Sequence, residues 1–205
     1  MKILIVGPSW VGDSVISQSL IKVILSKSKE AKIDVLSPEW TGNIFKRMDE
    51  VSETINLPFS HGEMKLKERA DLGKTLRVKN YDQAIVLPNS LKSSLVPYFG
   101  EIPIRTGWRG EMRFFLINDM RILDKKISPR MIDRFVALAF KTKSEQAVQA
   151  VFPLFFFAYI QFKIADLALP KCKSPEGLGA KRVKIFLSLF ILKLTYRNWF
   201  HFMKI

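Results

Sequence analysis

The chain has 205 residues, of which 48% are hydrophobic and 25% charged, a composition typical of globular proteins with a buried core. Its formal net charge of +14 predicts affinity for something anionic, but charge alone does not distinguish nucleic acid, a lipid surface and a phosphorylated substrate. One cysteine, Cys172, and two distant histidines, His61 and His201, offer neither an intramolecular disulfide nor metal-ligand spacing, so we expect no metal site.

Short apolar runs alternate with longer helical stretches through the first two thirds of the chain. This alternation predicts an α/β fold with a Rossmann-like parallel sheet flanked by helices. The first apolar run begins too close to Met1 for a signal peptide, so we expect a cytoplasmic protein. In chain order, the expected elements are strand 3–6, helix 14–26, strands 33–36 and 51–57, helix 63–78, strand 84–87, helix 91–98, strand 104–108 and helix 131–140.

Composition changes abruptly after Thr142. Residues 143–205 hold 10 of the 33 Lys and Arg, 3 of the 19 Asp and Glu, and 9 of the 16 Phe. We therefore expect one domain over 1–142 and an atypical, basic, Phe-rich tail over 143–205. The tail's two apolar runs, 152–160 and 185–194, are too short to span a bilayer, which needs roughly 20 residues. Three interpretations stay open: helices that cover the sheet, helices lying on an anionic membrane surface, or a segment not native to the fold.

A glycine-containing loop, Gly7-Pro8-Ser9-Trp10-Val11-Gly12-Asp13, follows the first expected strand. Open α/β sheets place their ligands at this carboxyl end of a strand. The spacing matches neither a P-loop nor a dinucleotide fingerprint, which argues against nucleoside triphosphate hydrolysis. The following helix N-terminus offers free N–H groups to a phosphate, so Ser9, Trp10 and Gly12 are expected near a bound phosphate. From local sequence, Asp13 is either a helix cap or a general base.

Two further motifs follow the loop over residues 7–13. They are Leu87-Pro-Asn-Ser-Leu-Lys-Ser-Ser-Leu-Val-Pro97 and Arg105-Thr-Gly-Trp-Arg-Gly-Glu-Met-Arg113, followed by Asn118-Asp119 and Leu123-Asp124-Lys125. In this order along the chain, the three motifs resemble those of the lipopolysaccharide heptosyltransferases of glycosyltransferase family 9, and among them the type II enzymes. The resemblance covers roughly residues 1–141 and implies the N-terminal, acceptor-side half of a GT-B fold, in which two Rossmann-like domains face each other across a cleft. It also favours Asp13 as the catalytic base over the cap.

The reaction that the resemblance implies is transfer of L-glycero-D-manno-heptose from ADP-heptose to the first heptose of the lipopolysaccharide inner core. It proceeds with inversion and needs no metal and no cofactor besides the donor substrate. Asp13 would activate the acceptor hydroxyl, and the phosphate expected near Ser9, Trp10 and Gly12 would belong to the donor. The implied partners are heptosyl-Kdo2-lipid A and ADP-heptose, with peripheral contact at the cytoplasmic face of the inner membrane.

The implied acceptor carries carboxylates and phosphates, so we expect a basic acceptor groove. Its candidate residues each have a plainer interpretation as part of a solvated face. Two neighbouring polar residues are suited to bind sugar hydroxyls, or to cap the helix that follows them. Trp10 is suited to stack on a sugar, whereas for Trp108 we favour buried packing. The basic candidates are Lys92, Arg105, Arg109 and Arg113, and the polar ones are Asn89 and Ser90.

Complete family members run to well over 300 residues, and their second domain supplies most of the donor site. Nothing after Thr142 matches that domain, so we expect a truncated chain whose activity is very low, because donor positioning supplies part of the rate. Our hypothesis is that the gene is interrupted and the tail translated out of frame. The alternative function is a non-catalytic remnant or acceptor-binding module. Nucleic-acid binding rests only on net charge, with no recognisable module, so we expect no nucleic acid partner.

Overall fold

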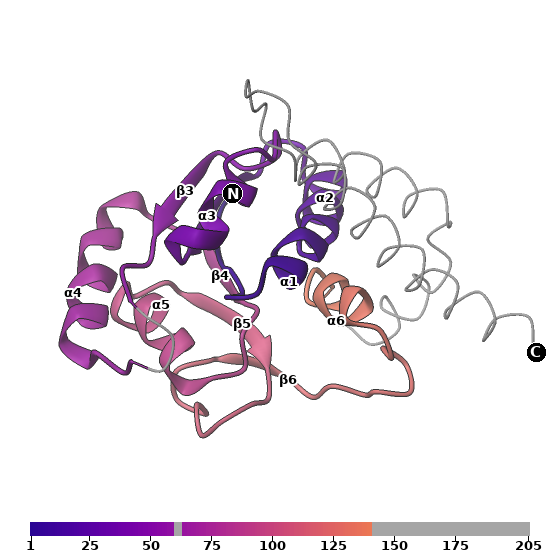
Figure 1. Ribbon diagram of the computed structural model, residues 1–205. Helices are drawn as coiled ribbons and strands as arrows, with labels where there is room; N and C mark the ends of the chain where they lie inside the picture. Colours follow the sequence, from indigo (N-terminus) through magenta and orange to yellow (C-terminus); the bar gives the residue numbers. More distant parts are fainter. Residues whose placement is uncertain (60–62, 141–205) are drawn as a thin grey trace, which may run out of the picture. The chain divides into compact units, whose positions relative to one another are not determined.

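The computed structural model describes residues 1–59 and 63–140 of the chain (Figure 1). Six parallel strands form one sheet in the order β3-β2-β1-β4-β5-β6. This is the order of Rossmann-type folds, so the predicted fold class is confirmed. The strands are β1 (Lys2–Val6), β2 (Lys32–Ser37), β3 (Glu53–Asn56), β4 (Gln83–Val86), β5 (Ile104–Trp108) and β6 (Asp119–Arg121).

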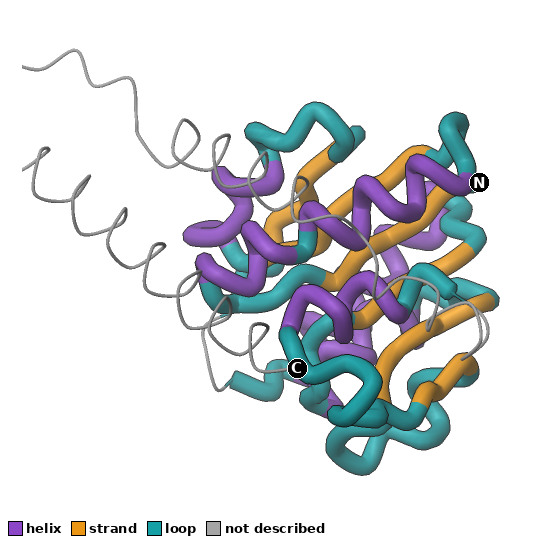
Figure 2. Tube along the Cα trace, turned by 90° about the vertical axis from the view of Figure 1, so that its right-hand side faces the viewer, coloured by secondary structure: helices purple, strands orange, loops and turns teal. Residues whose placement is uncertain are grey.

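Helices cover both faces of this sheet (Figure 2). One face packs against α2, α3 and α6, with α1 beside them, and the other against α4 and α5. The helices are α1 (Val11–Ile16), α2 (Gln18–Lys27), α3 (Glu39–Phe45), α4 (Leu66–Leu76), α5 (Leu95–Phe99) and α6 (Met131–Ala137), with 3-10 turns η1 (Arg77–Lys79) and η2 (Leu91–Ser94).

The central strands are apolar on both sides because both of their faces are covered. In β1, Ile3 and Ile5 belong to one buried cluster, and Leu4 and Val6 belong to the other. All four side chains are 2% exposed or less. This explains why β1 reads as a continuous apolar run rather than an alternating one.

Two expected helices differ in detail from the structure. The helix expected over 14–26 begins at Val11 and divides at Ser17 into α1 and α2, so Gly12 and Asp13 lie in a first helical turn, not in a loop. The helix expected over 91–98 is η2 followed by α5, with Pro97 inside the latter. The sequence pattern also missed α3, which is short and contains Gly42, and β6, which has only three residues.

The predicted tail, 143–205, and its boundary at residue 142 lie outside the described residues. The interpretations of the tail therefore stay predictions. Among the residues that the structure describes, no helix is long and apolar enough to cross a membrane.

Candidate functional site

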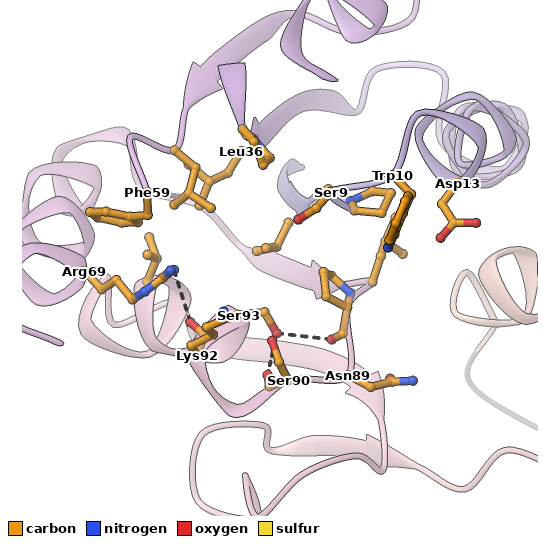
Figure 3. A pocket seen from close by; sticks show the side chains of 18 of the residues that line it. Ser9, Trp10, Asp13, Leu36, Phe59, Arg69, Asn89, Ser90, Lys92 and Ser93 are labelled. Atoms are coloured by element: carbon orange, nitrogen blue, oxygen red, sulfur yellow. Dashed lines mark hydrogen bonds between the residues drawn. The ribbon is translucent and has the colours of Figure 1, made fainter. Parts of the chain in front are cut away.

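The strand order reverses direction at β1, because the chain leaves β1 toward β2 and later returns on its other side to form β4. Loops leaving the carboxyl ends of these neighbouring strands diverge and leave a crevice. A cavity of about 460 Å³ lies there; we call it the switch-point pocket (Figure 3). Its polar and aromatic lining includes Ser9, Trp10, Asp13, Trp40, Phe59, Arg69, Asn89, Ser90, Lys92, Ser93 and Glu111.

Asp13 stands in the first turn of α1 and lines the pocket. The N-cap of α1 is Trp10, and no side chain caps the helix, so the structure contradicts the helix-cap interpretation of Asp13. Among the described residues, its half-buried carboxylate has neither a hydrogen-bond partner nor an ion-pair partner. Burial raises the pKa of the Asp13 carboxyl, because the charged form is partly desolvated. An unpaired carboxylate with a raised pKa, open to a cavity, is suited to accept a proton from a ligand.

The loop that precedes α1 is held by its neighbours. The indole Nε1 of Trp40 donates to the Ser9 carbonyl at 2.8 Å, whereas Trp10 stays 71% exposed at the pocket. A Cβ at Gly7 would lie 3.3 Å from the Phe45 ring, so packing restricts that position. A Cβ at Gly12 would meet nothing within 4 Å. Packing therefore does not require glycine at position 12.

Asn89, Ser90 and Lys92 follow β4 and all line the pocket, so the structure brings these three predicted residues onto the same cavity as Asp13. The Lys92 ammonium has no ion-pair partner among the residues described. Ser90 is the N-cap of η2 but makes no side-chain cap; instead the Leu91 N–H donates to Oε2 of Glu111 at 2.8 Å. The capping interpretation is therefore wrong for Ser90.

Arg113 does not face the pocket as predicted, because it is buried beside the loop that lines it. Its side chain is only 1% exposed, and its guanidinium donates to the carbonyls of Pro88 (2.7 Å) and Trp108 (2.6 Å). Burial lowers the pKa of Arg113 to about 10, against an opposing effect of Glu111. Nη1 and Nη2 of Arg113 thus make their shortest hydrogen bonds to backbone oxygens, and the side chain is not on the groove surface where we expected it.

Arg105 also lies away from the switch-point pocket. It sits near the amino end of β5, whereas the pocket lies at the carboxyl ends of the strands. Its Nε donates to the Leu116 carbonyl at 2.7 Å, and it lines a separate cavity with Tyr98 and Glu101. Arg109 follows β5 at the correct end, is exposed, and lies 5.8 Å above the Phe114 ring, but does not line the pocket.

Two charged pocket residues were not singled out from the sequence. Arg69 is 3% exposed on α4, donates from Nε to the Met64 carbonyl at 2.7 Å, and stacks 4.4 Å from the Phe59 ring. Burial lowers its pKa. Glu111 lines the pocket from the loop after β5. The sequence of the expected helix over 63–78 does not indicate which of its basic residues faces the pocket, so Arg69 could not be predicted. Glu111 lies within the motif over 105–113, which could have indicated it.

Trp108 is 4% exposed, and its Nε1 donates to the Arg134 carbonyl at 3.1 Å, so the predicted packing role is confirmed. Among the described residues, no group of three or more His, Cys, Asp and Glu side chains is placed to hold a metal ion. The polar groups of the site are therefore the carboxylates, amides, hydroxyls and cations given above.

Comparison with known proteins gives concordant matches. Residues 69–154 match the family model of glycosyltransferase family 9 (heptosyltransferase). Lipopolysaccharide heptosyltransferase 2 of Escherichia coli is 54% identical over 140 residues, which are 68% of this chain and 40% of the relative. Lipooligosaccharide heptosyltransferase 2 of Haemophilus ducreyi is 44% identical over 180 residues, 88% of this chain and 51% of the relative. The chain thus spans about half or less of these relatives, and the second match runs past residue 142, where we expected similarity to stop.

Solved structures agree with these matches. The structure of E. coli ADP-heptose LPS heptosyltransferase II matches with a TM-score of 0.68 at 49% identity, covering 75% of this chain and 45% of that one. An E. coli heptosyltransferase solved with ADP matches with a TM-score of 0.58 at 21% identity, over 70% of this chain and 47% of that one, and shows the shared fold alone. By sequence and fold together, the matched part of this chain is similar to the heptosyltransferases of glycosyltransferase family 9.

Proposed function

We propose that the described domain is the acceptor-side half of a glycosyltransferase that moves a heptose from ADP-heptose to the first heptose of the lipopolysaccharide inner core. The observation that carries this proposal is the half-buried carboxylate of Asp13 at the switch-point pocket, which has no partner among the described residues. The names of the relatives support the substrates, since they are lipopolysaccharide and lipooligosaccharide heptosyltransferases and a related structure is described as using ADP-heptose.

In this proposal the acceptor hydroxyl lies within hydrogen-bond reach of Asp13. As the hydroxyl oxygen attacks the anomeric carbon, the O–H bond breaks and its proton passes to the Asp13 carboxylate. The bond from the anomeric carbon to ADP breaks with its electron pair leaving on the diphosphate, so the configuration inverts. The raised pKa of Asp13 makes it a stronger base than an ordinary carboxylate, which favours this proton transfer.

Acceptor recognition is assigned to the segment after β4. Lys92 supplies a cation without an ion-pair partner among the described residues, and Asn89 and Ser90 supply hydrogen-bonding groups on the same cavity. Arg109 remains a proposed contact at the edge of the site. Ser9, Trp10 and Gly12 are proposed to lie near the donor phosphates, and the absence of a packing demand at Gly12 is compatible with close approach of a ligand.

Because the proposed acceptor is anchored in a bilayer, we also propose peripheral contact with the cytoplasmic face of the inner membrane. The formal net charge of +14 supports attraction to its anionic lipids.

The test of the proposed function is binding and transfer with the full chain. Calorimetry with a deacylated heptosyl-Kdo2 core oligosaccharide is expected to give saturable binding for the wild type and for Asp13→Asn alike, because the substitution keeps the shape of the side chain. Heptose transfer, followed by mass spectrometry, is expected only for the wild type. Absence of oligosaccharide binding would refute the proposal.

A second candidate is a non-catalytic acceptor-binding module, favoured by the binding groups of Asn89, Ser90 and Lys92 on one cavity, which serve acceptor binding whether or not transfer follows. The two candidates share the pocket and differ in the outcome of the same experiment. Saturable acceptor binding without any transfer by the wild type would support the module and exclude the transferase.

A further inference from the structure

The loop between β5 and β6 is hydrogen-bonded to the segment 88–94, which carries the proposed acceptor contacts. The Arg113 guanidinium donates to the carbonyl of Pro88 and, over longer distances, to the hydroxyls of Ser93 (3.3 Å) and Ser94 (3.2 Å). Its Nη2 faces Oδ1 of Asn89 at 3.4 Å. One buried side chain therefore ties together both ends of the segment from residue 88 to residue 94.

The chemistry of the two partners fixes which way the Asn89 amide turns. A guanidinium carries only donors, so the amide atom that faces Arg113 has to be the oxygen. The amide nitrogen then points away from Arg113 and has no hydrogen-bond partner among the described residues. In Figure 3 this nitrogen forms the outer tip of Asn89, on the side of the pocket where Asp13 lies.

The backbone of Asn89 is also fixed by contacts with the loop after β5, so a movement of the loop that carries Asn89 does not reorient its side chain. The Glu111 N–H donates to the Asn89 carbonyl at 3.1 Å. A Cβ added at Gly110 would lie only 2.3 Å from that carbonyl oxygen, which shows how closely the two loops approach. Asn89 is thus an exposed side chain on a fixed backbone with one fixed amide orientation.

We propose that Asn89 is a specificity-determining residue whose Nδ2 donates to an anionic oxygen of the acceptor, and that Arg113 is the positioning residue that keeps this donor turned outward. The inference rests on the proposed acceptor site. An amide N–H only donates, and Lys92 adds a positive charge to the same pocket, so both favour an oxygen that only accepts and carries negative charge. Carboxylate and phosphate oxygens have these properties.

Asn89→Asp tests the donor without disturbing the Arg113 contact. The substitution leaves an oxygen facing the guanidinium and replaces the outward N–H donors by a second, negatively charged oxygen. The melting temperature is expected to stay equal or to rise, since the contact with Arg113 becomes charge-assisted. The Kd for the anionic core oligosaccharide, measured by calorimetry, is expected to rise by about tenfold or more, because a hydrogen bond is replaced by repulsion.

Asn43→Asp is the matched control, because Asn43 is exposed on α3, does not line the pocket, and undergoes the same change of charge. The Kd of this control is expected to stay within about twofold of the wild-type value. This is well below the tenfold increase expected for Asn89→Asp, which corresponds to about 1.4 kcal/mol of binding free energy. Equal Kd values for Asn89→Asp and the wild type would overturn the inference. Equal weakening by both variants would overturn it too, by assigning the effect to net charge.

Arg113→Lys tests the positioning role, because a single ammonium lacks the planar fork that reaches several acceptors. We expect Arg113→Lys to bind the oligosaccharide more weakly than the wild type. The double variant Arg113→Lys/Asn89→Asp is expected to bind no more weakly than Asn89→Asp alone, because the two residues act on one contact. Fully additive losses would contradict the positioning role.

Two modified acceptors separate the sources of the anion. One acceptor lacks its phosphates, and the other has its sugar carboxyls reduced. The acceptor that has lost the group contacted by Asn89 is expected to bind the wild type and Asn89→Asp with equal Kd. An effect that persists undiminished with both acceptors would overturn the anionic contact. Failure of the wild type to bind any acceptor refutes the proposed function itself, whereas normal wild-type binding with an unaffected Asn89→Asp variant refutes only this inference.

Discussion

Gly110→Ala is expected to create a steric clash between the loop after β5, which carries Gly110, and the loop after β4, which carries Asn89. The added Cβ would lie 2.3 Å from the Asn89 carbonyl oxygen and 3.0 Å from the Asn89 Cβ, whereas ordinary contact begins at 3.4 Å. Both obstacles belong to a loop held by Arg113 and Glu111, so neither is the end of a flexible side chain. One of the loops therefore has to move by roughly 1 Å, as overpacked sites do.

The cost follows from the contacts that this movement disturbs. Overpacking of this kind costs about 1–3 kcal/mol, and loss of the Glu111 N–H bond to Asn89 adds about 1 kcal/mol. For a chain of this size, each 1 kcal/mol lowers the melting temperature by about 2–4 °C. We therefore expect a decrease of about 4–16 °C in thermal unfolding followed by circular dichroism.

Gly12→Ala is the control for this experiment. A Cβ at Gly12 meets nothing within 4 Å and lies within a helix, where alanine is favoured over glycine by about 0.5–1 kcal/mol. Its melting temperature is expected to stay unchanged or to rise slightly. An unchanged melting temperature for Gly110→Ala, together with wild-type acceptor affinity, would refute the steric reasoning and the fixed position of Asn89.

Two further predictions concern ionisable groups. Tyr81→Phe removes a hydrogen bond of 2.7 Å to the buried Asp34 carboxylate and is expected to cost about 1.5–3 kcal/mol in urea unfolding, whereas Tyr98→Phe, at a 40% exposed residue, should cost almost nothing. Equal effects of the two would contradict this. Asp13→Asn is expected to stabilise the fold at neutral pH, because the raised pKa of Asp13 means that its ionised form opposes folding. That gain should vanish below the unfolded-state value of 3.8, and a gain that persists in acid would contradict the assignment.

The sheet could be predicted because its strands carry their own signal. A strand buried on both faces is apolar at nearly every position, and residues 3–6 and 84–87 meet that demand whatever their neighbours are. Residues 33–36 meet it except at the buried Asp34, which accepts a hydrogen bond from Tyr81. β6 had no such signal, since its three residues, Asp119–Arg121, are only partly buried and pair at the edge of the sheet. Its place depends on β5, which no local pattern reveals.

The site could be predicted only in part, because sequence gives the charge of a residue but not the direction in which it points. Lys92 and Arg113 were equivalent as cations near a strand end. In the structure Lys92 lines the pocket, while Arg113 has enough donors to serve the backbone oxygens of the loop beneath it. Local sequence left Asp13 ambiguous between cap and base, and only the resemblance favoured the base. The structure contradicts the cap, because the helix starts at Val11 with Trp10 as its N-cap.

The measurement that tests the central claim most directly is a single-turnover assay with the protein in excess over core oligosaccharide and ADP-heptose supplied at saturation, so that even slow transfer is detected. Wild type is expected to convert the acceptor to a product heavier by one heptose, and Asp13→Asn to bind the acceptor equally but form no product above the protein-free control. Equal rates of conversion by the two proteins would contradict Asp13 as the base, and absence of product from the wild type would contradict the transferase.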